Sequence, residues 1–465
     1  MVKPAVGARR TDPAGMTTMW VWYLGDPMVP RLVGSVSLLR GSRCTFHYAR
    51  DWVAGGFALC PDMPLDVAKV YLPRQDMPAP GAIADAMPDR WGEAMIRLIE
   101  NPRRASPLDM LYYAADCRFG ALGISLSEKD YRPCPTQPLV TVASLEEANE
   151  VIQRAIMREH LSERERVLVA NTKSMGGTHP KMLIGVDGEQ WLAKFPKDDP
   201  VDLPLIEYAT NLLAREVGIT VPDVDVRNIG IAHVVMMKRF DRLPGGGRVH
   251  ALTARTMLLA SGDESYTGMA DVIRARAPAE LRDLQRRELF SRMAFNILVE
   301  NTDDHSKNHA FLRDETTGRY SMSPAFDLVP QMQGDRFQAM RVTPGADEDD
   351  FMAAIASCGS FGLKHEEAIA AWRHVAHGVS RWKEFFSGLG VSGSDIEYLG
   401  TTIDSDGRLA MRDDRIADTL PRPGAVEHGL GRRIAAARKR AATDRGPQDP
   451  DTDPDAPWSS GSSRG

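Results

Sequence analysis

Short runs of apolar residues near the start of the chain are typical of β-strands. Three runs between residues 19 and 48 are rich in aromatic and β-branched side chains and are separated by turn formers, a pattern that favours strands. Residues 61–140 contain more proline and more helix formers, and residues 91–99 are expected to form a helix. The pattern predicts a small α+β domain over residues 16–140, after a disordered leader over residues 1–15.

A second unit begins with a predicted hairpin. The apolar runs 181–186 and 190–195 flank Asp187-Gly188, and Asp-Gly between two apolar runs is a strong hairpin signal. Because side chains alternate along a strand, Lys194 is expected on the opposite face from Trp191.

The pattern then changes from strands to helices. A helix closed by Gly218 is expected first, since glycine is favoured just past a helix end. The expected elements are a helix over 204–217, a buried strand over 232–237, a helix over 281–300 opened by Pro278, a hairpin of 310–312 with 320–322, and helices over 364–400. A strand-rich unit over 174–240 that precedes a helical one over 250–420 has the order of a two-lobed kinase.

The composition is that of a globular protein. The chain has 465 residues, of which 43% are hydrophobic and 26% charged, and its net charge of −6 excludes a nucleic-acid binder driven by overall charge. The five cysteines are odd in number and widely spaced, which argues against a disulfide framework or zinc site and for a reducing compartment. No run approaches the ~20 apolar residues of a membrane helix, so we expect a cytoplasmic protein. The tail over residues 421–465 is expected to be basic and then disordered.

Phosphoryl transfer needs a backbone cradle for phosphates, a lysine, a base and metal ligands. Gly176 and Gly177 could let backbone amides approach an anion, and Lys181 follows at the start of a strand. A glycine loop of this kind is common in isolation. Lys194 either extends to the surface or faces a cleft, where Glu207 on the next helix could pair with it.

The polar segment 301–308 carries the strongest signal. Kinases place the base Asp five residues before a metal-binding Asn, and Asp303 and Asn308 have this spacing whereas Asp304 does not. The His-Arg pair of ordinary kinases is absent before it. Asp327 follows after a predicted hairpin, as the second metal ligand of kinases does. The segment could otherwise be a polar turn, but the four features in kinase order favour a kinase.

The combined motifs resemble the HipA family of bacterial toxin kinases. The resemblance extends from about residue 19 to about residue 400. The matching segments are 46–48 and 119–123 in the N-terminal part, and 174–181, 192–196, 207, 213–218, 238–242, 247–250, 302–308 and 324–327 in the C-terminal part.

The resemblance implies a fold, ligands and residue roles. The implied fold is a small N-terminal α+β domain followed by a two-lobed protein-kinase-like, lipid-kinase-related domain over residues 141–420, with its N-lobe over 165–245 and its C-lobe over 246–420. The implied ligands are ATP and Mg²⁺. The implied roles are Asp303 as base, Asn308 and Asp327 as metal ligands, Gly176, Gly177, Lys181 and Lys194 on the phosphates, His305 and Lys307 near the nucleotide, Lys238–Phe240 as the adenine hinge, and Ser174 as an autophosphorylated serine whose modification inactivates the kinase.

The resemblance also implies a biological role. Such kinases phosphorylate a hydroxyl of a protein, notably an aminoacyl-tRNA synthetase, and thereby stop translation. A helix-turn-helix antitoxin of the HipB type holds them and binds operator DNA, so that their contact with DNA is indirect. The family often has glycine at the position of Asp304, and the loop residues Thr178-His179 also differ from those of other members. We expect the Asp304 carboxylate beside the metal site.

Other functions compete with a toxin kinase. One is a catalytically weak kinase fold that acts mainly as an antitoxin-bound co-repressor, and another is a kinase for a small molecule or lipid. The intact set of Lys194, Asp303, Asn308 and Asp327 favours an active kinase. The basic segment 432–440 could touch DNA or could be a solvated helix end.

Overall fold

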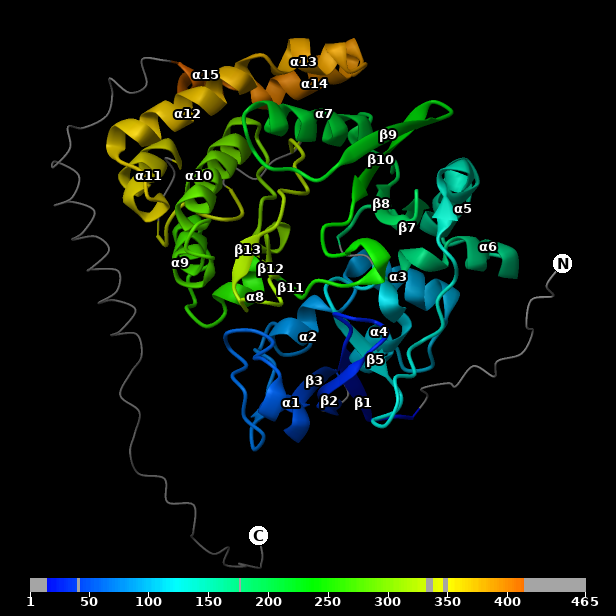
Figure 1. The fold of residues 1–465 in the computed structure, drawn as a ribbon. Coiled ribbons are helices and arrows are strands. Elements are labelled where there is room, and N and C mark those ends of the chain that lie inside the picture. Colours follow the sequence, from blue (N-terminus) through cyan, green and yellow to red (C-terminus); the bar gives the residue numbers. More distant parts are fainter. Residues whose placement is uncertain (1–14, 40–41, 175–176, 332–337, 346–349, 414–465) are drawn as a thin grey trace, which may run out of the picture. The chain divides into compact units, whose positions relative to one another are not determined.

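The computed structural model describes residues 15–39, 42–174, 177–331, 338–345 and 350–413 (Figure 1). All of these residues belong to one compact unit. Several sequence expectations lie outside the described residues, namely the leader up to residue 14, Gly176, and the tail over residues 421–465 with its basic segment.

The N-terminal domain is built on an antiparallel sheet. Its strands are β1 Thr18–Tyr23, β2 Arg31–Leu39, β3 Arg43–Tyr48, β4 Val70–Tyr71 and β5 Leu122–Ser125, in the order β4-β3-β2-β1-β5. Alternate residues of β3, namely Cys44, Phe46 and Tyr48, are fully buried, as the two-residue period of a strand requires. The strands expected between residues 19 and 48 are therefore confirmed.

Four helices accompany this sheet. They are α1 Arg50–Gly55, α2 Gly81–Asp85, α3 Arg90–Ile99 and α4 Pro107–Tyr113. The helix expected over residues 91–99 is confirmed as α3, which buries Trp91, Met95 and Ile96. Ser106 caps α4 and forms a capping box with Asp109, which satisfies backbone N–H groups that the first helical turn leaves unpaired.

The N-lobe is a second five-stranded sheet. Its strands are β6 Val140–Thr141, β7 Lys181–Val186, β8 Glu189–Lys194, β9 Val224–Ile229 and β10 Ala232–Lys238, in the order β6-β7-β8-β10-β9. The hairpin of β7 and β8 is confirmed. Asp187 and Gly188 have φ angles of +51° and +81°, the positive values that a type I′ turn needs.

Helices cover the N-lobe sheet. They are α5 Leu145–Ile156, α6 Glu163–Leu168 and α7 Leu203–Glu216. α7 matches the expected helix, and Gly218 follows it with φ +82°. Since β6 pairs in parallel with β7, the sheet begins at Val140, earlier than the expected N-lobe start near residue 165. A two-residue strand has no periodic signal of its own, so only its pairing reveals it.

The C-lobe is mostly helical, with one small sheet. The sheet joins β11 Ala251–Thr253 to the expected hairpin, which forms as β12 Ala310–Arg313 and β13 Tyr320–Met322. The helices are α8 Ala254–Leu258, α9 Tyr266–Arg276, α10 Arg282–Leu298, α11 Asp350–Ala356, α12 His365–Ser380, α13 Trp382–Gly388, α14 Gly393–Ile403 and α15 Asp406–Arg412.

The long C-lobe helix α10 begins at Arg282, one residue after the expected start at Leu281. Pro278 does not open it, because the amide of Leu281 bonds to the Pro278 carbonyl at 3.1 Å in a separate turn. The helical ladder begins only when the amide of Gln285 bonds to the Leu281 carbonyl at 2.9 Å. The expectation that Pro278 opens the helix is therefore wrong.

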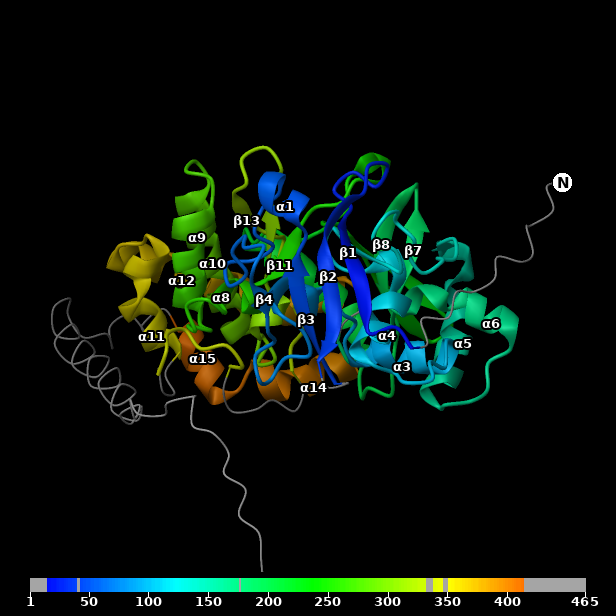
Figure 2. The same ribbon diagram turned by 90° about the horizontal axis from the view of Figure 1, so that it is seen from below.

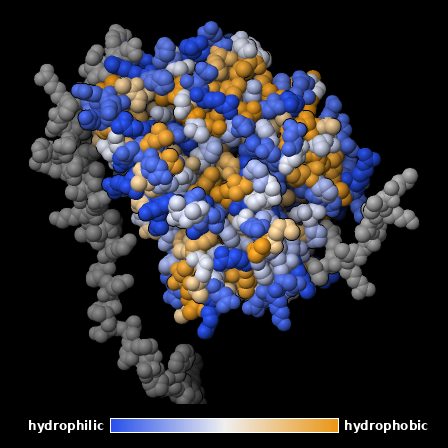
Figure 3. All heavy atoms as spheres, in the orientation of Figure 1, coloured by the Kyte–Doolittle hydropathy of each residue, from blue (hydrophilic) through white to orange (hydrophobic). Residues whose placement is uncertain are grey.

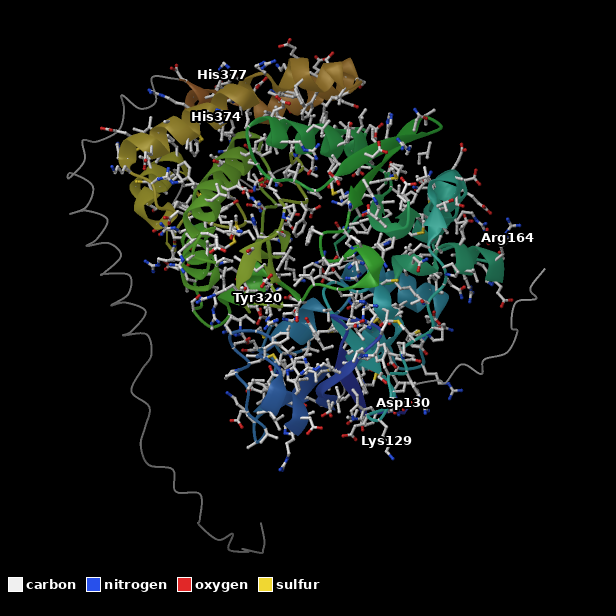
Figure 4. All side chains as sticks on the ribbon, viewed as in Figure 1. Lys129, Asp130, Arg164, Tyr320, His374 and His377 are labelled. Atoms are coloured by element: carbon white, nitrogen blue, oxygen red, sulfur yellow. The ribbon has the colours of Figure 1, made fainter. Side chains whose placement is uncertain are left out.

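α12 shows how the C-lobe helices bury one face. Its residues Trp372, Val375 and Val379 are buried, at the three- and four-residue spacing of a helical stripe. The labelled side chains of His374 and His377 lie on the other face, at the surface (Figure 4). The predicted helical region over 364–400 is therefore confirmed, although it is divided into α12, α13 and α14.

The N-terminal domain contacts both lobes of the kinase-like unit. The indole nitrogen of Trp91 donates to the Lys181 carbonyl in the N-lobe at 3.0 Å. His250 Nε2, just before β11 in the C-lobe, lies 2.8 Å from the Leu59 carbonyl. Seen from below, β1–β3 lie between the C-lobe helices α9–α12 and the N-lobe strands β7 and β8 (Figure 2). The exact domain boundary near residue 140 stays a prediction.

The described surface shows no extended apolar region on the side that Figure 3 displays. Hydrophobic residues form separate patches among hydrophilic ones on that face. Among the described helices, none combines the length and the apolar character that crossing a membrane requires.

Candidate functional site

A cleft of about 860 Å³ lies between the two lobes and the N-terminal domain. This volume is within the ~300–1,000 Å³ of small-molecule sites. The sequence-predicted residues that line it are Ser174, Gly177, Lys181, Glu207, Lys194, Lys238, Phe240, Asp303, His305, Lys307, Asn308 and Asp327. The fold thus brings together segments that lie up to about 150 residues apart in the chain, and the roles of these residues stay predictions.

Lys194 lies at the centre of an ionic cluster in the cleft. Its ammonium bonds to Glu207 on α7 and, at 2.6 Å, to Asp327 Oδ1. Burial would lower the pKa of Lys194, but the carboxylates of Asp327 and Glu207 outweigh it and raise the pKa above its ordinary value. Burial would likewise raise the pKa of Asp327, but Lys194 and Lys181 hold it well below its ordinary value. Both groups are therefore charged at neutral pH.

Lys181 is a second cation in the cleft, and no ion pair is described for it. It is buried, and burial, followed by the nearby charge of Lys194, lowers its pKa. A β-carbon on Gly177 would lie 2.6 Å from Lys181 Nζ, and Gly177 has φ +83°. The positive φ angle favours glycine at this position. Lys181 and Lys194, with Gly177 beside them, therefore fit an anion such as a phosphate group.

The predicted catalytic loop, residues 301–308, follows α10. Asp303 is exposed within the cleft, and its carbonyl accepts hydrogen bonds from the His305 amide at 2.9 Å and from Asn308 Nδ2 at 3.1 Å. Because Nδ2 of Asn308 is engaged in this bond, its amide oxygen is the atom left for a ligand. Asp327 has φ +60°, a conformation that non-glycine residues adopt at a cost and that is found at functional sites.

The donor atoms of the cleft fit Mg²⁺ bound together with a phosphate. Asn308 and Asp327 both line the cleft and offer the oxygen ligands that Mg²⁺ prefers. In the described part of the chain, no group of three or more His, Cys, Asp or Glu residues could hold a metal ion. Mg²⁺ is usually bound by one or two carboxylates plus substrate phosphates and water, so the oxygens of Asn308 and Asp327 would suit it.

The expectation that Asp304 lies beside the metal site is wrong. Its side chain is only 2% exposed and does not line the cleft. It accepts a hydrogen bond from the Tyr266 hydroxyl and lies 2.8 Å from His309 Nε2. The loop is irregular here and directs neighbouring side chains to opposite sides, so Asp303 faces the cleft and Asp304 faces the core of the C-lobe.

Besides Lys194, two more of the predicted nucleotide lysines have carboxylate partners in the protein. Lys307 Nζ lies 2.8 Å from Asp89 Oδ1 of the N-terminal domain, and both side chains are about two-fifths exposed, at 38% and 41%. Lys238 Nζ lies 2.8 Å from Glu189 on β8. An anionic ligand would have to compete with these carboxylates for either lysine.

The expected hinge has few backbone groups left for adenine. The amides of Lys238 and Arg239 donate to neighbouring carbonyls at 2.9 and 3.0 Å. At Phe240, by contrast, the ring lies 5.4 Å from the ring of Phe326, centroid to centroid. The hinge therefore offers an aromatic wall, which suits a flat base.

Phe119 is a cleft residue whose position the sequence did not reveal. It comes from the N-terminal domain, lines the cleft, and its ring lies 6.3 Å from that of Phe240. Asp241 holds this segment by accepting from the Gly120 amide at 2.8 Å, and Arg239 donates to the Cys117 carbonyl at 2.7 Å. Residues 119–123 stood out only through family resemblance, and no spacing signal links them to the hinge.

Ser174 lies at the edge of the cleft. It is 6% exposed, and its hydroxyl is buried without a hydrogen-bond partner. The hydroxyl is therefore closed off from solvent in this conformation, although Ser174 lines the cleft.

Comparisons with known proteins agree with this arrangement. Two family models match the chain: the HipA N-terminal domain over residues 28–125 and the HipA-like C-terminal domain over residues 173–382. The serine/threonine-protein kinase toxin HipA of Shewanella oneidensis is 25% identical over 369 residues, which are 70% of this chain and 78% of that protein. The inferred kinase Y4dM of Sinorhizobium fredii is 27% identical over 169 residues, 33% of this chain and 41% of that protein.

A solved structure shares the fold. It is the complex of Shewanella oneidensis HipA and HipB with operator DNA, and the match covers 85% of this chain and 96% of the matched chain. The TM-score is 0.59 and the sequence identity 20%. This likeness supports the predicted α+β fold with a kinase-like unit.

Proposed function

Because the chain belongs to the HipA family, we propose that it is an ATP-dependent serine/threonine protein kinase that acts as a toxin. The observation that carries the proposal is the cleft itself. Lys194, paired with Glu207 and Asp327, shares this cleft with Asp303 and Asn308. These are the parts that phosphoryl transfer requires.

Each group of cleft residues has its own role in the proposed phosphoryl transfer. Lys181 and Lys194 offset the charge of the ATP phosphates, and the glycine loop brings backbone amides to them. Asn308 and Asp327 would hold Mg²⁺, which neutralises charge on the phosphate oxygens when it is bound. Asp303 accepts the proton of the acceptor hydroxyl, and Phe240 with Phe119 contacts the adenine.

We further propose that Ser174 is a site of self-phosphorylation. A phosphate there would add a charge of about −1.5 to −2 to the loop that itself has to hold phosphates. Because the Ser174 hydroxyl is buried, the modified loop could not return to the closed arrangement. Self-phosphorylation would therefore inactivate the kinase.

The proposed partners follow from relatives. One matched structure contains HipB and operator DNA together with HipA. We propose a HipB-like helix-turn-helix antitoxin for this chain, with operator DNA bound through it, and a protein hydroxyl as acceptor. A translation enzyme such as an aminoacyl-tRNA synthetase and a cytoplasmic location stay predictions.

Incubation with labelled ATP and Mg²⁺ tests this proposal. We expect label on the wild-type chain, mapped to Ser174 by phosphopeptide analysis, and none on Asp303→Asn. Ser174→Ala is the matched control, because it should lose its own label and still label an acceptor protein. Equal labelling of wild type and Asp303→Asn would overturn the assignment of the base.

A further inference from the structure

A chain of buried hydrogen bonds runs behind the catalytic loop and connects it to the Asp327 segment. Its members come from α9, α10 and the loop itself. In order they are His309, Asp304, Tyr266, Asn296, Asn301 and the carbonyl of Asp327. The first four do not line the cleft, so contact with a nucleotide does not account for them.

The first half of the chain surrounds the Asp304 carboxylate. His309 Nε2 lies 2.8 Å from one oxygen, and the Tyr266 hydroxyl donates to the other. Asp304 is 2%, Tyr266 2% and His309 5% exposed. Burial, and secondarily the Asp304 charge, raises the pKa of Tyr266 well above its ordinary value. Tyr266 therefore keeps its proton and remains the donor.

The second half carries the connection to the predicted metal ligand. Asn296 Nδ2 on α10 donates to the Tyr266 hydroxyl at 3.1 Å. Asn301 Nδ2 donates to Asn296 Oδ1 at 3.1 Å and approaches the Asp327 carbonyl at 3.4 Å. Asn301 thus joins the start of the catalytic loop to the backbone of Asp327, whose φ angle is positive.

The start of α9, which carries Tyr266, is itself held in place by hydrogen bonds. The Tyr266 amide donates to the Arg341 carbonyl at 3.0 Å, and the Ser265 hydroxyl caps the helix. A second tie runs in parallel, since the Ser306 hydroxyl of the catalytic loop bonds to Glu264. Removing the Tyr266 hydroxyl alone should therefore loosen the loop without detaching it.

We propose that Tyr266 and Asp304 are positioning residues that hold Asp303 and Asp327 in a fixed relation across the cleft. The proposal rests on the proposed kinase function, because positioning has meaning only for a reaction at those two carboxylates. Its physical basis is that buried hydrogen bonds of this kind favour one arrangement of the groups that they join, although His309 Nδ1, at the end of the network, has no hydrogen-bond partner. Displacement of a catalytic group by about 1 Å can lower a rate by about 10²-fold.

Tyr266→Phe tests the chain of hydrogen bonds, because it removes the hydroxyl and keeps the ring that packs edge-on against His309. Tyr48→Phe is the matched control. Tyr48 is also fully buried, and its hydroxyl also makes two hydrogen bonds, to the Met63 carbonyl at 2.8 Å and from the Leu59 amide at 2.9 Å. It lies on β3 of the N-terminal sheet and does not line the cleft.

The first readout is hydrogen exchange of the protein without nucleotide, which does not depend on activity. We expect Tyr266→Phe to raise amide exchange in both segments 300–309 and 324–330, and Tyr48→Phe to raise it in neither. The second readout is self-labelling with MgATP, measured beside nucleotide affinity. We expect Tyr266→Phe to lower the turnover rate about 10- to 100-fold with the nucleotide Kd changed less than about threefold.

The outcomes separate the proposal from its premise. Faster exchange confined to residues 300–309 would overturn the connection to Asp327. Faster exchange in both segments with an unchanged rate, or a rate loss matched by Tyr48→Phe, would overturn the positioning role. Absence of phosphoryl transfer by the wild-type protein would overturn the proposed function, and the positioning role with it, whereas the exchange result would still report whether the two segments are connected.

Discussion

The catalytic loop presents two neighbouring carboxylates to opposite environments. On its cleft side, Asp303 is exposed and lies among the predicted nucleotide residues. On its core side, Asp304 is 2% exposed and is engaged by Tyr266 and His309. The same type of side chain is available for chemistry on the cleft side of the loop and serves as a hydrogen-bond acceptor on the core side. The contrast shows that surroundings, and not residue type, separate the two roles.

The comparison also separates activity from stability. A carboxylate in the cleft, such as that of Asp303, is exposed and can take part in the reaction without being buried by folding. A buried carboxylate contributes to folding because its removal leaves other buried polar groups unpaired. Substitutions on the two faces should therefore have different signatures.

The largest effect on activity is expected at Asp303. Asp303→Asn should lower self-labelling about 10²- to 10⁴-fold, the usual contribution of a general base, because the amide cannot accept the hydroxyl proton. The melting temperature should stay within about 2 °C of wild type. A much lower melting temperature for this variant would show that Asp303 also stabilises the fold, and would weaken the contrast with Asp304.

Lys194 is expected to affect both properties, because it is buried and also faces the cleft. Lys194→Met leaves the buried Glu207 without its cation, and breaking a buried pair costs about 3–5 kcal/mol. Denaturant unfolding should reveal this loss, and self-labelling should also fall, though by less than in Asp303→Asn. The double variant Lys194→Met/Glu207→Gln should regain stability but not activity. A double variant as unstable as Lys194→Met would contradict the pairing.

Asp304 should affect stability directly, and the reaction rate only through the positioning of Asp303 and Asp327. Asp304→Ala leaves the Tyr266 hydroxyl and the His309 imidazole without their acceptor, and an unsatisfied buried group costs about 1–3 kcal/mol. Asp304→Asn retains one acceptor oxygen and should cost less. Urea unfolding of both variants measures the difference. If Asp304→Ala were as stable as the wild type, Asp304 would contribute no more to stability than Asp303, and the distinction between the two sides of the loop would be lost.

The smallest effect is expected at the pair of Lys307 and Asp89. The two side chains are 38% and 41% exposed, and exposed ion pairs typically contribute about 0–1 kcal/mol. A double-mutant cycle of Lys307→Met and Asp89→Asn should therefore give a coupling energy below about 1 kcal/mol that falls with added salt. A coupling energy above about 2 kcal/mol would mean that this pair ties the N-terminal domain firmly to the catalytic loop.

Local patterns predicted the elements that depend on neighbouring residues. The hairpin of β7 and β8 follows from Asp187-Gly188, whose φ angles are both positive, and the end of α7 follows from Gly218. Elements that depend on distant partners were missed. β6 and β11 are two and three residues long and exist because of pairing with β7 and β12, so their own residues carry no periodic signal.

The residues of the candidate site were predicted better than their surroundings. Spacing selected Asp303 and Asn308, and the structure places both in one cleft with Lys194 and Asp327. The location of Asp304 was predicted wrongly, because a spacing rule does not state which side of a loop a side chain faces. The contribution of Phe119 to the cleft was not expected either, because it depends on how the N-terminal domain packs against the hinge.

The sequence alone is sufficient to predict the order of elements, the kinase-like unit and the set of reactive side chains, because these depend on short-range periodicity, turn chemistry and residue spacing. The tertiary structure adds what each side chain faces. Asp303 borders solvent in the cleft, whereas Asp304 is enclosed by Tyr266 and His309. Burial and hydrogen-bond partners come from segments far away in the chain, and no local pattern encodes them.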